Sequence, residues 1–279
     1  MDASIAVFMP ARNEHETIGE NLRFLKEMLR RGKINHVALV IDGSVDGTRE
    51  IIFRELGLNS EEIKKLTGKN RGTILHNGFV IINHAQPEGK GRSFMEAMFT
   101  LKGRTNHFKD PKSAVVNIDA DALYLKEEHI TRLVEEMRRK EVPMLLGDHQ
   151  ERNRNDPARY AGNGPGSTGY RAIAGRALEP LFKMDEKWAH TLPPQFGMDY
   201  ALNLLIYPKS IDVPLLVPRS GIELGHLPSG RHLSDSEQVM QRHEARNRFE
   251  GDLRLVHENA AFRERNAQRQ GKIRHKKVR

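Results

Sequence analysis

The chain has 279 residues, of which 38% are hydrophobic and 29% charged, and this size fits one large domain or one domain with an extension. No apolar run approaches the ~20 residues that a membrane span requires, and the first residues lack the basic and then apolar layout of a secretory signal. The sequence contains no cysteine, which excludes disulfides and thiolate zinc sites. We therefore expect a cytoplasmic protein in which any metal is bound by oxygen and imidazole.

The formal net charge is +8, from 45 Lys and Arg against 37 Asp and Glu. Such a balance attracts anionic partners, which include phosphates, nucleic acids and membrane surfaces, and charge alone does not choose among them. Part of the excess lies in the basic segment 271–279 at the end of the chain. A solvated tail would have the same composition.

The first elements predict a β-α-β unit. The apolar, β-branched runs 4–9 and 36–41 are typical of buried strands. Between them, apolar residues recur at helical spacing at Ile18, Leu22, Leu25 and Leu29. Asn13 and Glu16 match an N-cap and its reciprocal acid, so we expect them to begin this helix.

The alternation of strand and helix patterns continues to about residue 150. We expect helices at 48–56, around 94–99 and at 126–140, and strands within 73–82 and at 114–118 and 142–146. This order predicts a mostly parallel α/β sheet. After Gly147 a polar segment is typical of a long loop, followed by helical patterns at 171–183 and 198–207 and a strand at 211–217. A charged helical extension is expected from Ser234, which has Glu237 as its capping-box partner.

Polar segments follow three of the expected strands directly: 10–14 (PARNE), 42–48 (DGSVDGT) and 119–121 (DAD). Ligands of open parallel sheets bind beyond the carboxyl ends of the strands, so these segments should face one crevice. In an extended segment, Asp119 and Asp121 would point the same way and reach one hard cation and the phosphates that it bridges. An ordinary turn or a helix cap would also place Asp at these positions.

Two phosphate-binding motifs can be excluded. The segment 89–93 (GKGRS) has a Gly-Lys, but His84 and Gly91 stand where a P-loop needs Gly and Ser or Thr. The segment 164–169 fits Gly-x-Gly-x-x-Gly, yet polar residues precede it where a dinucleotide site needs an apolar strand.

With PARNE, DGSVDGT, GKGRS and DAD in this order, the chain resembles glycosyltransferases of the GT-A fold, especially family 2. Within that group, the Gly-Lys-Gly, the Gly-Met-Asp at 197–199 and a later histidine are similar to those of glucosyl-3-phosphoglycerate and mannosylglycerate synthases. The resemblance implies a GT-A fold, with helices on both sides of a mostly parallel sheet and a C-terminal helical extension.

The resemblance also implies roles for individual residues. Contacts to the nucleotide sugar fall to Pro10, Ala11, Glu14, Asp42, Lys90, Asp119 and Ala120, among which Lys90 would approach the diphosphate. Metal binding, of Mg²⁺ or Mn²⁺, falls to Asp121 and His226, with His232 as the alternative histidine. Acceptor binding falls to Gly169, Tyr170 and Arg171. The catalytic residue would be Asp199, as general base if the transfer inverts the anomeric centre and as an orienting group if it retains it.

These roles imply transfer of a sugar from a nucleotide-diphosphate donor to a small anionic acceptor, such as a phosphoglycerate or glycerate. Residues 1–150 would then bind the nucleotide sugar, 151–233 the acceptor, and 234–279 would form the extension and basic tail. Alternatives are a lipid-phosphate or polysaccharide acceptor with peripheral membrane contact, a sugar-phosphate nucleotidyltransferase, and a nucleic-acid-binding protein. The low aromatic content, 6%, counts against nucleic acid. As a further partner we consider a second copy of the chain, which would form a homodimer.

Overall fold

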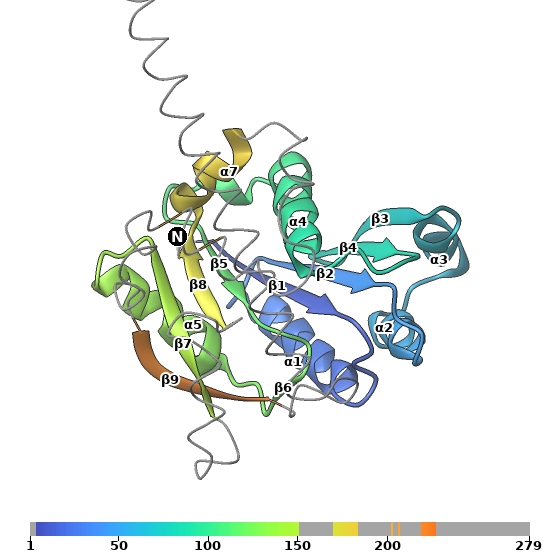
Figure 1. Ribbon diagram of the computed structural model, residues 1–279, viewed down its shortest axis with the longest axis horizontal. Coiled ribbons are helices and arrows are strands. Elements are labelled where there is room, and N and C mark those ends of the chain that lie inside the picture. The colour runs from blue at the N-terminus through green and yellow to red at the C-terminus, as the bar shows by residue number, and fades with distance from the viewer. Residues whose placement is uncertain (1–3, 151–169, 184–201, 203–205, 207–218, 227–279) are drawn as a thin grey trace, which may run out of the picture. The chain divides into compact units, whose positions relative to one another are not determined.

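The computed structural model describes residues 4–150, 170–183, 202, 206 and 219–226, all within the compact unit Met1–His232 (Figure 1). Within these residues no helix is long and apolar enough to cross a membrane. The first half of the fold consists of β1 (Ile5–Ala11), α1 (Ile18–Arg30), β2 (His36–Asp42), α2 (Thr48–Leu56), α3 (Ser60–Thr67), β3 (Arg71–His76), β4 (Phe79–His84) and α4 (Lys90–Arg104). The remaining elements are η1 (His107–Lys109), β5 (Ala114–Asn117), β6 (Ala122–Leu123), α5 (Glu127–Arg139), β7 (Met144–Gln150), β8 (Arg171–Ala174), η2 (Gly175–Leu178), α7 (Glu179–Lys183) and β9 (Arg219–His226).

The described strands form one mixed sheet in the order β3-β4-β2-β1-β5-β8-β7-β9-β6. The expected parallel pairing is found in β4, β2, β1 and β5, which lie side by side. Antiparallel pairs flank them, β3 with β4 on one side and β8 with both β5 and β7 on the other. The fold is therefore an α/β sheet of the expected class, with a parallel centre and a mixed second half.

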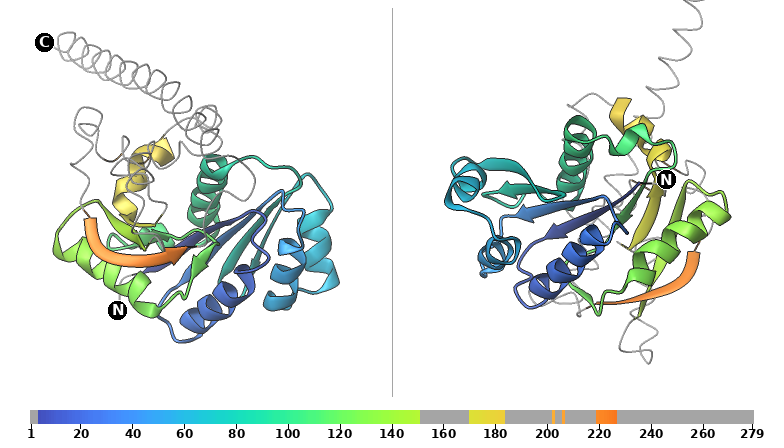
Figure 2. Two further views of the ribbon diagram at one scale, coloured as in Figure 1. Left: turned by 60° about the horizontal axis from the view of Figure 1, so that its bottom comes forward. Right: turned by 180° about the vertical axis from the view of Figure 1, so that it is seen from behind.

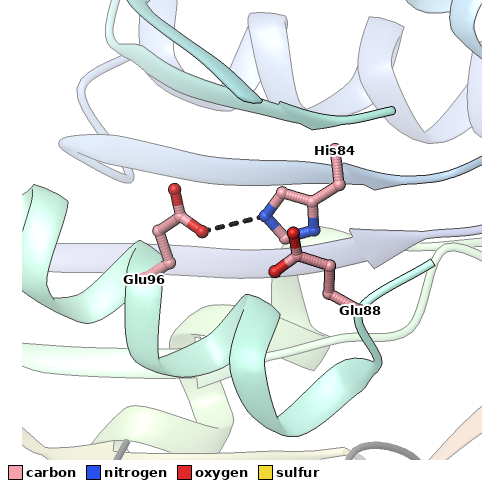
Figure 3. Close-up of side chains that lie close together, drawn as sticks. All are labelled: His84, Glu88 and Glu96. Carbon is pink, nitrogen blue, oxygen red and sulfur yellow. Dashed lines mark hydrogen bonds and ion pairs between the residues drawn. The ribbon is translucent and has the colours of Figure 1, made fainter. Parts of the chain in front are cut away.

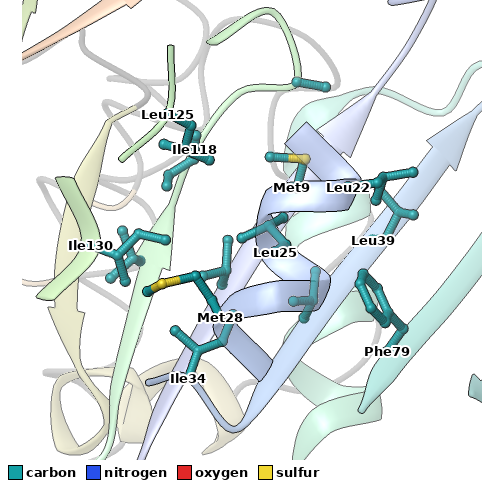
Figure 4. Packing of buried hydrophobic residues seen from close by; sticks show 14 of the residues in the cluster. Met9, Leu22, Leu25, Met28, Ile34, Leu39, Phe79, Ile118, Leu125 and Ile130 are labelled. Carbon is teal, nitrogen blue, oxygen red and sulfur yellow. The ribbon is translucent and has the colours of Figure 1, made fainter. Parts of the chain in front are cut away.

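Helices cover both faces of the sheet (Figure 2). One core contains the buried faces of α1, α2 and α5, where Leu22 and Leu25 of α1 pack with Met9 and Leu39 of the sheet (Figure 4). The second core lies on the opposite face and contains α4, η2 and α7, with Phe8 and Phe94 in edge-to-face contact at 5.1 Å between ring centroids. Strands buried on both faces explain the continuous apolar runs in the sequence.

Most of the expected elements before residue 150 are confirmed, and the differences have local causes. The expected cap of α1 is wrong, because Thr17 holds the N-cap position and makes no side-chain cap bond. Helix α3 was not predicted, although Asn59 and Glu62 form a capping box at its start.

The helix expected from Arg171 is wrong for its first turn, because Arg171–Ala174 form β8. The loop expected after Gly147 is also wrong at its start, since β7 continues to Gln150. Of the helix expected at 198–207 only Leu202 and Ile206 are described, and both are helical. The strand expected at 211–217 and the extension from 234 lie outside the described residues, and the three-part division of the chain stays a prediction.

Candidate functional site

The carboxyl ends of β4, β2, β1 and β5 lie at one edge of the sheet, because these neighbouring strands run parallel. The segments that follow β1 and β2 bind each other there. The backbone N–H of Asn13 donates to Ser44 Oγ at 3.2 Å, and that of Glu14 donates to Thr48 Oγ1 at 2.7 Å. In return, Asn13 Oδ1 accepts the N–H of Val45 at 3.0 Å. PARNE and DGSVDGT therefore form one connected rim, as their positions after adjacent strands indicated.

Asp119 and Asp121 lie in the turn that joins β5 to β6. The backbone N–H of Ala122 donates to the carbonyl of Asp119 at 3.1 Å, which makes the two aspartates the first and third residues of a β-turn. The extended geometry expected for them is therefore wrong. Both side chains are half-buried at the edge where the strands end.

Helix α1 holds this turn from below. Thr17 Oγ1 donates to the carbonyl of Ala120 at 2.6 Å. Asn21 Nδ2 donates to the carbonyls of Ala120 and Ala122, at 3.0 Å each. Both side chains are buried, so the turn is fixed by hydrogen bonds that water does not replace. Sequence reasoning missed Thr17 and Asn21, since their spacing of four residues indicates only a shared helix face.

Lys90, the first residue of α4, reaches the turn from a different segment. Its Nζ lies 2.6 Å from Asp119 Oδ1 and 2.9 Å from Oδ2. The side chains are 20% and 29% exposed, respectively, so the pair lies at the surface of the rim. The structure thus brings together two residues, 29 positions apart, that the resemblance assigned to the donor.

Asp42, at the end of β2, is buried and turned toward the segment between β4 and α4. Its Oδ1 accepts the N–H of Glu88 at 2.7 Å, and its Oδ2 accepts the N–H of Gly89 at 2.8 Å. Burial by itself raises the pKa of Asp42, but hydrogen bonds from His84 and these two amides outweigh it and leave the pKa below its usual value. Both oxygens of Asp42 therefore bind protein groups, and its contact with a nucleoside stays a prediction.

Other residues assigned to the donor differ in exposure. Pro10 and Glu14 are half-buried at the rim. Ala11 and Ala120 are buried in the core beneath it, so their methyl groups do not face a ligand. The nucleotide-sugar roles of all four stay predictions.

The described residues assigned to the acceptor are both buried on β8 or beside it. The hydroxyl of Tyr170 donates to the carbonyl of His129 in α5. Arg171 is fully buried and pairs in register with Asn117 at the end of β5. A guanidinium can bind a carboxylate or phosphate through two parallel hydrogen bonds, but the acceptor-binding roles of Tyr170 and Arg171 stay predictions. Gly169 lies outside the described residues.

The backbone of His226 lies next to the aspartate turn, because the last residue of β9 pairs with Ala122 of β6. Asp121 thus directly precedes the residue that pairs with His226, and the metal-binding roles of both residues stay predictions. Asp199 and the alternative histidine, His232, lie outside the described residues, and their roles stay predictions.

Three further side chains lie close together behind the rim: His84, Glu88 and Glu96, whose ligand atoms lie within 4.8 Å of one another (Figure 3). That spacing would suit a cation, but each nitrogen of His84 already faces a carboxylate, Asp42 on one side and Glu96 on the other, at 2.9 Å. The three residues therefore form part of an ion-pair network in this structure. Sequence reasoning missed His84, although a polar residue ending an apolar strand is the signal that identified Asp42.

Comparison with known proteins identifies the family. The model of glycosyl transferase family 2 matches residues 6–183. No curated protein matches the chain in a sequence search.

Solved structures share the fold at low sequence identity. Glucosyl-3-phosphoglycerate synthase from Mycobacterium tuberculosis in complex with Mn²⁺, UDP and glucosyl-3-phosphoglycerate is 16% identical, with a TM-score of 0.53 over 86% of this chain and 77% of that one. The same enzyme with Mn²⁺, UDP-glucose and phosphoglyceric acid gives a TM-score of 0.52 at 16% identity over 85% and 75%. A further mycobacterial protein gives 0.51 at 17% identity over 85% and 70%. The chain therefore belongs to glycosyl transferase family 2 and is a nucleotide-sugar-dependent glycosyltransferase of the GT-A fold.

Proposed function

We propose that this glycosyltransferase uses a uridine diphosphate sugar and transfers the sugar to a small anionic acceptor of the phosphoglycerate or glycerate class. The observation that carries the proposal is the meeting of Lys90 and Asp119 at the rim, 2.6 Å apart. An ammonium placed at the carboxyl edge of a parallel sheet suits a diphosphate. Support for UDP comes from the structural relatives, whose complexes contain UDP or UDP-glucose.

The donor would displace Asp119 from Lys90. The diphosphate would then accept the charge-assisted hydrogen bonds of the ammonium, and Asp119 would turn to hydroxyl groups of the ribose or sugar. The rim formed by Asn13, Glu14 and Ser44 is bound together by its own hydrogen bonds. The rim would therefore present its backbone groups to the nucleoside in a preorganised form, which reduces the entropy cost of ordering these loops on binding.

Asp121 and His226 fit a site for Mg²⁺ or Mn²⁺. One is a half-buried carboxylate in a fixed turn, and the backbone of the other lies beside that turn through the Ala122 pairing. Carboxylate and imidazole with sites left for phosphate oxygens are a donor set that Mn²⁺ accepts. When bound, the ion would supply Lewis-acid stabilisation of the leaving diphosphate.

The acceptor would bind near β8. Arg171 is fully buried there, so its guanidinium would have to exchange its contacts within the protein for the carboxylate or phosphate of the acceptor. Gly169 and Tyr170 would shape this side of the site. We assign Asp199 to the acceptor hydroxyl, as general base in an inverting reaction or as an orienting group in a retaining one. The acceptor class is supported by relatives solved with phosphoglyceric acid and with glycerol 3-phosphate.

Thermal unfolding with UDP-, GDP- and ADP-glucose, each with and without Mn²⁺, tests the donor. A ligand at a hundred times its Kd stabilises the native state by about 2.7 kcal/mol, so only UDP-glucose with Mn²⁺ should raise Tm by several degrees. Lys90→Ala should remove most of this rise. The matched control is Lys65→Ala, since Lys65 forms a similar pair with Glu61 at 2.8 Å on the surface of α3, and it should leave the rise intact.

Transfer from the selected donor to 3-phosphoglycerate, glycerate and glycerol 3-phosphate then tests the acceptor. Arg171→Lys should raise the KM for the anionic acceptor more than that for the donor, because an ammonium cannot bind a carboxylate in two places. Binding of GDP- or ADP-glucose in preference to UDP-glucose would contradict the donor assignment. Transfer to a lipid phosphate but to none of the three small molecules would contradict the acceptor assignment.

A further inference from the structure

The segment between β4 and α4, residues 85–89, leads directly to Lys90 and is held from β2. Asp42 accepts the N–H groups of Glu88 and Gly89 at 2.7 and 2.8 Å. Gly89 has φ 93° and ψ 158°, a conformation essentially restricted to glycine. Gly43 must also be glycine, because an added Cβ would lie 2.4 Å from the backbone nitrogen of Pro87. Asp42 therefore fixes the position of Lys90, the first residue of α4.

Asp42 is in turn held by His84, whose side chain is buried and 1% exposed. The Nδ1 of His84 lies 2.9 Å from Asp42 Oδ1, and its Nε2 lies 2.9 Å from Glu96 Oε2 in α4. Only the imidazolium has a donor on each nitrogen. Burial lowers the pKa of His84, but the hydrogen bonds to Asp42 and Glu96 outweigh burial and raise its pKa to about 9.

The charges around this imidazole balance only when it is protonated. Glu88 lies close to His84 and is bound by Arg71 of β3, at 2.7 and 2.5 Å, and by Arg92 of α4, at 2.6 Å. Arg71 also lies opposite His84 in the β3–β4 register. The charged groups facing the imidazole from the surrounding elements are thus Asp42, Glu88 and Glu96 against Arg71 and Arg92. The three carboxylates need a third cation, and His84 supplies it.

We propose that His84 is a positioning residue for donor binding, whose imidazolium ties α4 to Asp42 and so holds the segment that places Lys90 beside Asp119. This inference rests on the proposed use of a diphosphate donor at Lys90. His84 does not touch the donor in this scheme. Loss of its proton removes the hydrogen bond that His84 makes to either Asp42 or Glu96. This loosens residues 85–89 and weakens diphosphate binding, while the acceptor side on β8 is unaffected.

The test compares His84→Gln and Glu96→Gln with the wild type over pH 6–9.5, with UDP and Mg²⁺ as the probe in calorimetry. Glu96→Gln keeps a hydrogen-bond acceptor but removes a charge, so the pH at which UDP affinity falls should move down by about one unit, which is the tenfold effect of losing one favourable charge contact. His84→Gln should weaken UDP binding about tenfold at pH 7 and leave the acceptor KM within about twofold. Coincident pH profiles for Glu96→Gln and wild type would overturn the proposal.

Hydrogen exchange of residues 85–90 in the ligand-free protein supplies a readout that does not depend on the donor. His84→Gln should accelerate exchange of the Glu88 and Gly89 amides at every pH, because their acceptor Asp42 is no longer fixed. Glu96→Gln should do so at about pH 8.5, where its imidazole has lost the proton that the wild type still holds. The matched control is His76→Gln on β3, where an imidazole also bridges Glu62 at 2.7 Å and the carbonyl of Leu56 at 3.0 Å, away from this segment. It should change neither readout.

The two readouts separate failure of this inference from failure of the proposed function. If wild-type protein binds no UDP, the donor assignment fails, and accelerated exchange in Glu96→Gln still supports the positioning role of His84. Unchanged exchange in Glu96→Gln overturns that role whether or not UDP binds. Should His84→Gln fail to fold, Glu96→Gln decides both questions, because it retains the imidazole and a hydrogen-bond acceptor for it.

Discussion

Asn117, at the end of β5, is a buried amide whose replacement should stabilise the protein. Its side chain is fully buried, and neither Oδ1 nor Nδ2 has a hydrogen-bond partner in the part of the chain that the structure describes. Its neighbours in register are Phe8 of β1 and Arg171 of β8, and the strand around it is otherwise apolar. We predict that Asn117→Leu, which branches at the same carbon, raises the free energy of unfolding of the ligand-free protein.

The size of this gain follows from the desolvation of the Asn117 amide, which no hydrogen bond compensates. An unsatisfied buried polar group costs about 1–3 kcal/mol, and the slightly larger leucine offsets part of the gain by tighter packing, at up to about 1 kcal/mol. The expected net gain therefore lies between about 0 and about 3 kcal/mol, with a centre of about 1.5 kcal/mol. For a chain of this size each kcal/mol raises Tm by roughly 2–4 °C.

Urea unfolding and calorimetry in the absence of ligand measure this gain, and Asn21→Leu is the matched control. Asn21 is also a buried asparagine, but its Nδ2 donates to the carbonyls of Ala120 and Ala122. Thr17 still binds the first carbonyl in the variant, so the loss falls on the second and should destabilise by about 1–2 kcal/mol. If Asn117→Leu were destabilised as much as Asn21→Leu, the amide would have a partner in solution and the reasoning would be refuted.

Three further outcomes follow from the same contacts. Gly43→Ala should destabilise by more than about 2 kcal/mol in urea unfolding, because the site has φ 63° and the added Cβ would lie 2.4 Å from Pro87 N; an unchanged midpoint would contradict the tight contact. Tyr170→Phe should cost about 1 kcal/mol, the value of its buried hydrogen bond to a carbonyl of α5, and calorimetry would reveal a larger loss if the hydroxyl did more. Burial raises the pKa of Asp46, but hydrogen bonds, first from Thr48, outweigh it and lower the pKa to about 2. Its stabilising contribution should therefore be complete above about pH 4 and disappear as pH falls through about 2, and acid unfolding of Asp46→Asn should be less steep over that window than that of the wild type.

The sequence predicted the centre of the fold well, because its signals there are local. The runs 4–9 and 36–41 became β1 and β2, since a strand buried on both faces must be apolar throughout. The spacing of Ile18, Leu22 and Leu25 became the buried face of α1. The polar segments after β1, β2 and β5 lie at one edge of the sheet. This is because the three strands are neighbours and run parallel, so their carboxyl ends lie on the same side.

Other features depended on distant partners that a local pattern does not contain. Asn13 has the composition of a cap, yet it lies at φ 57° and accepts the N–H of Val45 from the next loop. Arg171–Ala174 has helical spacing but completes the sheet between β5 and β7. In both places the hydrogen bonds offered by another segment outweigh the local preference.

By itself the sequence determined that the chain forms an α/β sheet with acids placed directly after its buried strands, because burial and backbone periodicity are properties of contiguous residues. Only the tertiary structure decided which of those acids lie at the rim and which are buried behind it. Asp119 faces Lys90 at the rim, whereas Asp42 accepts hydrogen bonds from His84 and from two backbone amides behind the rim. The physical reason is that a carboxylate takes its role from the donors that surround it, and those donors come from β4, α4 and the segment between them.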